Sequence, residues 1–402
     1  MKFLLPLLFV ISSITTAYSQ YCTSDERFTE VEYFELSEID STTNVVYGNA
    51  LDRFDVPADL LIDFYYPKAS ADPLSERPFV LMIHGGGFQT GNKNDRKGEC
   101  IALAQRGYVT ATMSYRLGWN TLIPSTQLLA IYRAHQDAHA ALRYISANAG
   151  DYDIDTDWMF IGGSSAGAIT ANNVVYTDQD EWNTIVPTAE SSLGLIDTSG
   201  NDLTNTFEIN GVFNNWGAVP LATMDVAQMV PQIAFHADGD PTVEIDTSAL
   251  LMGSRSIHYT LLDNDICSNI TVDLSTDHGI YRNLTGAIFR ASKTSCFFKS
   301  IFCDDCVDVY TNDSIPANCT ATAGFEDLDS KQYSIYPNPA NDDLNITGLT
   351  GNENFSIFSV KGELIVQYTN QESINISALS KGIYFLQIEL NQEIEMIRFV
   401  KN

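Results

Sequence analysis

Residues 158–167 read Trp-Met-Phe-Ile-Gly-Gly-Ser-Ser-Ala-Gly, an apolar run followed by small residues around two serines. A short continuous apolar run predicts a strand that is buried on both faces. The alanine-rich segment 166–175 that follows is suited to start a helix. Glycines on either side allow a tight turn between the two elements, which places the hydroxyl of Ser165 at the exposed tip and Ser164 one place early. The sequence therefore predicts a strand, a sharp turn and a helix.

Further strands and helices are predicted on both sides of this turn. Buried strands are indicated at residues 78–84, 109–115 and 231–236, helices at 96–106 and 128–149, and edge strands by alternating residues within 27–66. Strands that alternate with helices favour right-handed crossovers and a mostly parallel sheet covered on both faces. We therefore expect an α/β fold with a mostly parallel central sheet covered by helices.

A run of glycines, His84-Gly-Gly-Gly-Phe88, ends one of the upstream strands. Glycines let the backbone approach a ligand closely and direct N–H groups at one point. The N–H groups of Gly86 and Gly87, together with that of Ala166, are predicted to form an oxyanion hole for a tetrahedral intermediate. An ordinary flexible loop is the alternative. Because the run ends at the same end of the sheet as Ser165, we favour the oxyanion hole.

A nucleophilic serine requires a histidine base and an acid that orients the histidine. Asp238 and Asp240 both follow the strand at 231–236 and are candidates for the acid. The base is expected later in the chain, which leaves His258 and His278. His258 falls within residues 248–263, which are predicted to be helical and suggest a structural histidine. His278 lies in a Thr-Asp-His-Gly-Ile loop after a strand-like segment, where an imidazole can reach the serine.

Four motifs, in chain order, resemble the carboxylesterase and hormone-sensitive-lipase branches of the α/β-hydrolase superfamily. They are Ile83-His-Gly-Gly-Gly-Phe-Gln-Thr-Gly91, Ser114-Tyr-Arg-Leu117, Asp137-Ala-His-Ala-Ala-Leu-Arg143 and Gly163-Ser-Ser-Ala-Gly167. The similarity covers about residues 28–295. It implies an α/β-hydrolase fold and a serine ester hydrolase.

The resemblance also bears on the acid. The family spacing places the acid four residues after a histidine and three before a valine, which favours Asp240 and leaves Asp238 as a turn residue. The chain departs from the family pattern at Gly163-Ser164 and at Ala168. The segment between Ser165 and Asp240 is also short and leaves little material for a large lid.

These residues predict ester hydrolysis through an acyl-enzyme. Ser165 attacks the ester carbonyl after giving its proton to His278, and Asp240 holds the imidazole and stabilises its positive form. Water then releases the acyl group, and no metal or organic cofactor is needed. The side chains expected to line the substrate pocket are Phe88, Trp119 and Trp216. The expected substrates are acyl or aryl esters, including aromatic esters and esters attached to polysaccharide.

Two other functions fit parts of this pattern. A serine peptidase can use the same fold and residues, but the chain has no recognisable propeller or other gating domain. A catalytically inactive, cholinesterase-like adhesion module is the second alternative. Such modules usually lose the nucleophile or the base, whereas this chain keeps Ser165, Asp240, His278 and the glycine run.

Length and charge limit the domain count and the partners. A chain of 402 residues, 45% of them hydrophobic, suggests two domains with substantial cores. The 22 basic and 51 acidic residues give a formal net charge of −29. Such an excess of negative charge disfavours nucleic acid and anionic membrane surfaces as partners.

The first residues have the composition of a secretory signal peptide, with Lys2 before an apolar run over 3–14 and small residues at a cleavage site before Gln20. The run is shorter than the ~20 apolar residues of a membrane span, so no stable span is expected after its removal. We expect the signal to occupy residues 1–19.

The seven cysteines of an exported chain predict disulfide bonds. Four of them cluster at Cys296, Cys303, Cys306 and Cys319. The pair Cys303 and Cys306 also has the spacing that begins a zinc site, but no histidine follows His278 to complete one. The odd number leaves one thiol free, for which Cys100 in a predicted helix is the candidate.

The composition changes after Cys319. Residues 320–332 are small, polar and charged without periodicity, which predicts a linker between a catalytic domain at 20–319 and a small β-sandwich at 333–402. The sandwich resembles the sorting domain of the type IX secretion system through Ile335-Tyr-Pro-Asn-Pro-Ala-Asn341, Lys361-Gly362, Ile376-Ser-Ala-Leu379 and Gly382-Ile-Tyr-Phe385. This resemblance implies a bacterial protein that is exported by that machinery, secreted or held at the cell surface, and cleaved near the linker. A carbohydrate-binding sandwich is the alternative.

Overall fold

The structure is a computed structural model of the chain. It describes residues 20–22, 25–123, 125–221, 223–248, 251–280, 282, 284–311, 333–338, 340–349, 351–359, 364–369, 371, 373–390 and 393–401. The predicted signal peptide at 1–19 and the predicted linker at 320–332 lie outside these residues.

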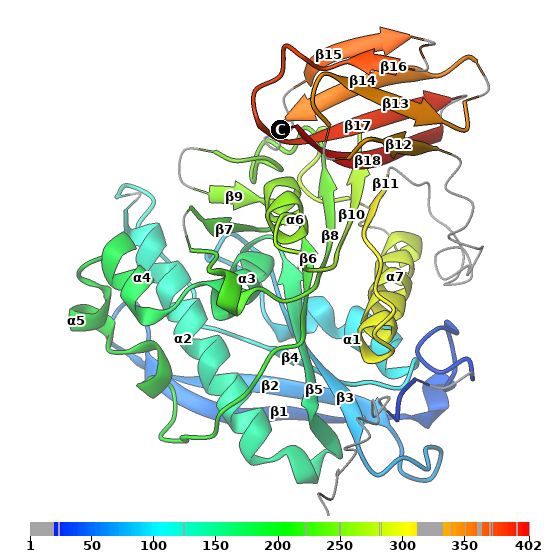
Figure 1. Cartoon of the computed structure of the whole chain (residues 1–402). Helices are drawn as coiled ribbons and strands as arrows, with labels where there is room; N and C mark the ends of the chain where they lie inside the picture. Colours follow the sequence, from blue (N-terminus) through cyan, green and yellow to red (C-terminus); the bar gives the residue numbers. More distant parts are fainter. Residues whose placement is uncertain are drawn as a thin grey trace, which may run out of the picture.

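Nine of the described strands form one large sheet, in the order β1-β2-β4-β3-β5-β6-β8-β10-β11 (Figure 1). Their bounds are β1 Ile39–Leu51, β2 Pro57–Pro67, β3 Arg77–Ile83, β4 Val109–Met113, β5 Ile154–Ser164, β6 Gly211–Asn215, β8 Gln232–Ala237, β10 Ser268–Asp273 and β11 Val309–Thr311. The first two strands pair antiparallel at one edge, and every pairing from β4 to β11 is parallel. The α/β fold with a mostly parallel sheet is thus confirmed.

Helices cover both faces of this sheet (Figure 1). Those of eight or more residues are α1 Lys97–Ala104, α2 Thr126–Ala147, α3 Ala166–Tyr176, α6 Ser254–Leu262 and α7 Leu284–Phe302. The shorter ones are α4 Gln179–Ile185, α5 Ala189–Leu193 and the 3-10 turns η1 Leu36–Glu38, η2 Lys93–Arg96, η3 Ala149–Asp151, η4 Ile196–Thr198 and η5 Val226–Gln228. One core cluster joins α2 and α3 to the sheet, and another joins α1 and α7 to its other face.

The burial of the central strands explains why they are apolar throughout. Every residue of β3, β4 and β6 is buried, because helices lie on both faces of the sheet. The predicted helix at 128–149 corresponds to α2, and that at 96–106 to α1. The helix predicted over 248–263 is wrong at its start, since a short strand, β9 Leu251–Gly253, pairs with β7 Ala218–Pro220 before α6 begins.

The C-terminal strands form two antiparallel sheets that share one core. The sheets are β12-β13-β16 and β15-β14-β17-β18, with bounds β12 Ser334–Tyr336, β13 Asp343–Thr347, β14 Asn354–Ser359, β15 Leu364–Thr369, β16 Ser373–Asn375, β17 Gly382–Leu390 and β18 Glu393–Lys401. Buried side chains such as Leu344, Phe355 and Phe399 lie between them. This confirms the predicted all-β sandwich.

Two disulfides tie distant parts of the first domain together. One joins Cys22 near the start of the described chain to Cys303 after α7. The other joins Cys267 before β10 to Cys306 before β11, two neighbouring strands at the edge of the sheet. Both cysteines of the possible zinc pair, Cys303 and Cys306, are therefore occupied by disulfides.

The other described cysteines match the prediction of disulfide bonds and one free thiol. Cys100 is a free, buried thiol on α1, as predicted. Burial raises the pKa of this thiol well above its ordinary value, so the thiol stays protonated and poorly reactive. Cys296 on α7 is disulfide-bonded, and Cys319 lies outside the described residues.

Removal of the long-range disulfide should lower the stability of the first domain. Cys22→Ser with Cys303→Ser is expected to reduce the free energy of unfolding by roughly 2–5 kcal/mol, because the bond restricts the unfolded chain over a long loop. Cys100→Ala, which leaves the disulfides intact, is the control and should cost less. Urea unfolding of the three proteins measures this. Equal free energies of unfolding for the double variant and the wild type would contradict a stabilising role of the Cys22–Cys303 disulfide.

Candidate active site

Ser165 occupies the turn between β5 and α3 in a backbone conformation that is rare for a residue other than glycine. Its φ is 54° and its ψ is −120°. Its N–H donates to the carbonyl oxygen of Asn215 at the end of β6, with an N–O distance of 2.9 Å. Such strain persists only where the surrounding structure holds it. The neighbouring strand and the start of α3 supply that support here.

Two glycines allow this turn to form against the end of β3. A Cβ atom at either Gly163 or Gly167 would clash with the carbonyl oxygen of Ile83. The absence of side chains therefore brings the turn directly against the segment where β3 passes into the glycine run. The serine and the backbone of the run are positioned by the same close contact.

His278 lies between Ser165 and Asp240 and contacts both. Its Nε2 is 2.8 Å from the Oγ of Ser165, and its Nδ1 is 2.8 Å from Oδ2 and 3.0 Å from Oδ1 of Asp240. The three residues come from the segments that follow β5, β8 and β10, so they meet at the carboxyl end of the parallel sheet. A neutral imidazole with its proton on Nδ1 donates to Asp240 and accepts from the serine hydroxyl.

The carboxylate of Asp240 is almost fully buried and heavily hydrogen-bonded. Burial alone raises the pKa of Asp240, but hydrogen bonds from His236, His278 and the N–H groups of Thr242 and Val243 outweigh it and hold this pKa well below its usual range. His236 also contacts the Oγ of Ser254 and the carbonyl oxygen of Val243. Asp240 is thus fixed as an anion that can orient an imidazole.

The competing acid and base lie elsewhere. Asp238 is half-exposed and pairs with Arg255. His258 is buried on α6, and its Nδ1 is 2.8 Å from the Oγ of Ser268. Burial lowers the pKa of His258 to about 3. Neither residue contacts Ser165 in the described hydrogen-bond network.

Three backbone N–H groups near Ser165 have no acceptor among the described residues. In the described part of the chain, the N–H groups of Gly86, Gly87 and Ala166 donate to no backbone or side-chain oxygen. Gly86 and Gly87 have φ values of 111° and 60°, which orient this loop in a way that other residues rarely adopt. Ala166 starts α3, where free N–H groups and the helix dipole favour negative charge. These groups can stabilise an oxyanion.

A largely buried chain of charges supports both the serine turn and the histidine loop. Arg96 donates to the Oγ of Ser164 at 2.9 Å and pairs with Glu99 at 2.7 Å. Glu99 also pairs with Arg290 of α7 at 2.6 Å, and Arg290 donates to the carbonyl oxygen of Ile280 at 3.0 Å. Ile280 is two residues after His278. The sequence motifs did not indicate this network, which therefore adds positioning residues that sequence reasoning missed.

The three aromatic residues predicted to line a pocket differ in their surroundings. Phe88 is 1% exposed and packs in the main core, near the ring of Tyr115. Trp216 is 5% exposed and packs against Gly279, so it supports the loop that carries His278. Only Trp119 among the three lines a described cavity.

Within the described ranges, no three His, Cys, Asp or Glu side chains gather in a way that could hold a metal ion. Among the described helices, none combines the length and the apolar character needed to span a bilayer.

Two family models match this chain. Residues 62–234 match the family BD-FAE, and residues 334–402 match the secretion system C-terminal sorting domain. The chain is thus similar to an esterase-type α/β-hydrolase family over residues 62–234 and to a secretion sorting domain over residues 334–402. The second match confirms the predicted sorting domain, which marks the protein as exported, either secreted or at the cell surface.

Several curated proteins are similar over part of the first domain. Carboxylesterase 1C of Mus musculus is 27% identical over 161 residues, which cover 40% of this chain and 27% of the relative. Gut esterase 1 of Caenorhabditis briggsae is 30% identical over 30% of this chain and 24% of its own length. Neuroligin-2 of Homo sapiens is 32% identical over 27% of this chain and 13% of its own. The chain thus spans about a quarter or less of the length of the curated relatives named here.

Solved esterase structures also align with the chain. A propionate-bound esterase from Thermogutta terrifontis is 20% identical and covers 65% of this chain and 92% of its own, with a TM-score of 0.46. An inhibited esterase B from Lactobacillus rhamnosis is 16% identical and covers 66% of this chain and 87% of its own, with a TM-score of 0.44.

The environment of Asp240 predicts how stability depends on pH. The depressed pKa of Asp240 stabilises the fold fully above the ordinary carboxyl pKa of about 4, and this stabilisation declines as pH falls below it. Asp240→Asn should therefore cost roughly 2 kcal/mol at neutral pH, and the gap to wild type should narrow in urea unfolding near pH 3.

Asp238→Asn is the matched control, because it removes the same charge two residues away at a half-exposed site. It should change the free energy of unfolding by less than about 1 kcal/mol. A gap between wild type and Asp240→Asn that stays constant or widens with acid would contradict the electrostatic account of Asp240.

Proposed function

We propose that the protein is a secreted serine carboxylesterase that hydrolyses carboxylic esters through an acyl-enzyme at Ser165. The observation that carries this proposal is the hydrogen-bonded series Ser165–His278–Asp240, with 2.8 Å at each link, at a strained turn of the sheet. A serine on an ordinary surface does not combine these three features.

Each group has a role that follows from its position. His278 takes the proton of Ser165 as the oxygen attacks the ester carbonyl, and the Asp240 carboxylate stabilises the resulting imidazolium. The N–H groups of Gly86, Gly87 and Ala166 receive the negative charge that develops on the carbonyl oxygen. His278 then protonates the departing alkoxide, and water releases the acyl group by the reverse steps.

The proposed order of segments along the chain fits an enzyme that is exported before it acts. In this proposal residues 1–19 form the signal peptide, 20–319 the catalytic domain, 320–332 the linker and 333–402 the sorting domain. The type IX secretion machinery binds the sorting domain, which is removed at or near the linker. A mature extracellular protein that still contains residues 333–402 would contradict that removal.

A catalytically inactive, cholinesterase-like adhesion module is the main rival, and a neuroligin is among the proteins similar to this domain. Sequence similarity alone does not separate the two functions, because esterases and neuroligins both match this domain. The assembled serine, histidine and aspartate favour the enzyme. A serine peptidase would use the same three residues and differs in its preference for amides.

Substitution of Ser165 tests the reaction directly. Ser165→Ala should lower kcat/KM for p-nitrophenyl acetate by about 10⁴-fold, because the nucleophile is lost. Ser192→Ala, at an exposed serine on α5, is the control and should keep wild-type activity. A continuous absorbance assay measures both, and circular dichroism checks that each variant is folded.

The outcomes separate the three functions. Wild-type activity in folded Ser165→Ala would show that another residue is the nucleophile. No ester hydrolysis by any of the proteins would favour the non-catalytic module. Faster cleavage of the corresponding p-nitroanilide than of the ester by wild type would favour the peptidase.

A further inference from the structure

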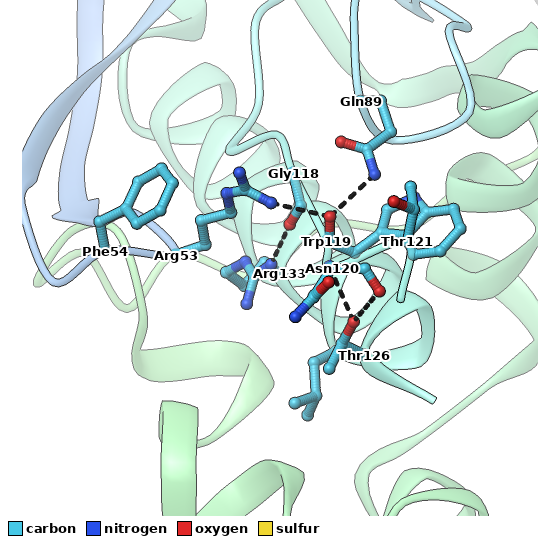
Figure 2. A pocket seen from close by; sticks show the side chains of 10 residues that line it. Arg53, Phe54, Gln89, Gly118, Trp119, Asn120, Thr121, Thr126 and Arg133 are labelled. Carbon is cyan, nitrogen blue, oxygen red and sulfur yellow. Dashed lines mark hydrogen bonds between the residues drawn. The ribbon is translucent and has the colours of Figure 1, made fainter. Parts of the chain in front are cut away.

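A polar cavity lies beside the glycine run that ends β3. Its volume is about 670 Å³, which is within the usual range for a small-molecule site. Trp119 links the cavity to the glycine run, since its Nε1 donates to the carbonyl oxygen of Gly87 at 3.0 Å. Gln89, two residues after Gly87, donates to the carbonyl oxygen of Trp119 at 2.9 Å (Figure 2). The cavity is thus adjacent to the oxyanion donors proposed above.

Two arginines converge on one wall of this cavity. Arg53 donates to the carbonyl oxygen of Trp119 at 2.7 Å, and Arg133 donates to that of Gly118 at 2.6 Å (Figure 2). Gly118 has a φ of 103°, and a Cβ atom there would lie 2.6 Å from the Cδ of Arg53. The glycine therefore leaves room for the Arg53 side chain to pass into this position.

Neither arginine has a carboxylate partner among the described residues. Arg133 is 6% exposed, and its Nε has no hydrogen-bond acceptor. Asp137 on the same helix is paired with Arg116 instead. The Asp52 carboxylate attracts both arginines electrostatically but forms no ion pair with either, and it accepts the backbone N–H groups of Phe54 and Val56.

Arg133 is a buried guanidinium that forms no ion pair among the described residues, and Arg53 adds a second, exposed guanidinium to the same wall. The chain has 22 basic and 51 acidic residues, so carboxylates for pairing are abundant. Burying the Arg133 charge without an ion pair is costly, and a ligand anion would lower that cost. Arginine presents parallel N–H groups that match the two oxygens of a carboxylate.

The remaining lining is suited to a sugar ring. Phe54, at the rim, is 67% exposed, and the guanidinium of Arg53 lies 4.4 Å from its ring centroid. Asn120, Thr121 and Gln89 add polar groups to the wall. A saccharide packs a face of its ring against an aromatic side chain, and its hydroxyl groups form hydrogen bonds with amide and hydroxyl side chains.

We propose that this cavity is a subsite for a uronic-acid unit, with its carboxylate held by Arg53 and Arg133. The inference rests on the proposed function only in one respect: the ester that is cleaved at Ser165 would lie on the bound saccharide or on a unit next to it. The esterase would then act on esters of acidic polysaccharide. Binding of the saccharide itself does not depend on catalysis.

The test compares binding of glucuronate and glucose to the whole protein. The two sugars differ only by a carboxylate in place of a hydroxymethyl group. Glucuronate should bind measurably by isothermal titration and raise Tm, whereas glucose should do neither. Arg53→Gln should weaken glucuronate binding by about tenfold or more, because a charge-assisted contact is lost. Lys97→Gln, which removes an exposed cation on α1, should bind glucuronate as wild type does.

Arg133→Gln should weaken glucuronate binding to a similar extent. Arg133 is buried, so this variant can fail to fold; Arg53 is exposed, and Arg53→Gln then still tests the site. No glucuronate binding by wild type would overturn the subsite. Equal binding of glucose would show that the carboxylate is not recognised, and equal binding of inorganic sulfate would show that the site is not specific for a saccharide. Either result also overturns it.

The p-nitrophenyl acetate assay is run on the same wild-type preparation. Ester hydrolysis without glucuronate binding would remove the subsite and keep the proposed function. Glucuronate binding that Arg53→Gln abolishes, in a protein without hydrolysis, would keep the subsite and remove the proposed function.

Discussion

The site depends on the close approach of β5 and α3 to the end of β3, which glycine alone permits. Gly163 and Gly167 leave no room for a side chain against the carbonyl oxygen of Ile83. That contact imposes the positive φ of Ser165 and fixes the start of the glycine run relative to the serine. The parallel sheet then brings the loops after β8 and β10, which carry Asp240 and His278, to the same edge.

Ion pairs between charged side chains stabilise the positions of the serine turn and the histidine loop. Arg96, Glu99 and Arg290 connect the residue before the serine to the loop that carries His278, through contacts between 2.6 and 3.0 Å. Breaking a buried pair leaves an uncompensated charge, which is strongly destabilising. The network therefore resists separate movement of the serine turn and the histidine loop. Two disulfides add long-range restraints of the kind expected in an exported protein.

Local patterns predicted much of this molecule, because the features concerned are short in sequence. The strand, turn and helix around Ser165 follow from an apolar run and glycines, and the free thiol at Cys100 follows from an odd number of cysteines in an exported chain. Non-local features could not be predicted in the same way. Helix α7, the disulfide partners and the pairing of Glu99 with Arg290 depend on contacts between residues far apart in the chain. Aromatic character alone also failed to separate Trp119, which lines a cavity, from Phe88 in the core.

The most direct test of the account is covalent labelling of the folded protein with a fluorophosphonate, which reacts with activated serines. Intact mass and peptide mapping should show a single adduct on Ser165, and both His278→Ala and Ser165→Ala should abolish it. A folded wild-type protein that takes no label, or an adduct on a different residue, would contradict the claim that Ser165 is an activated nucleophile.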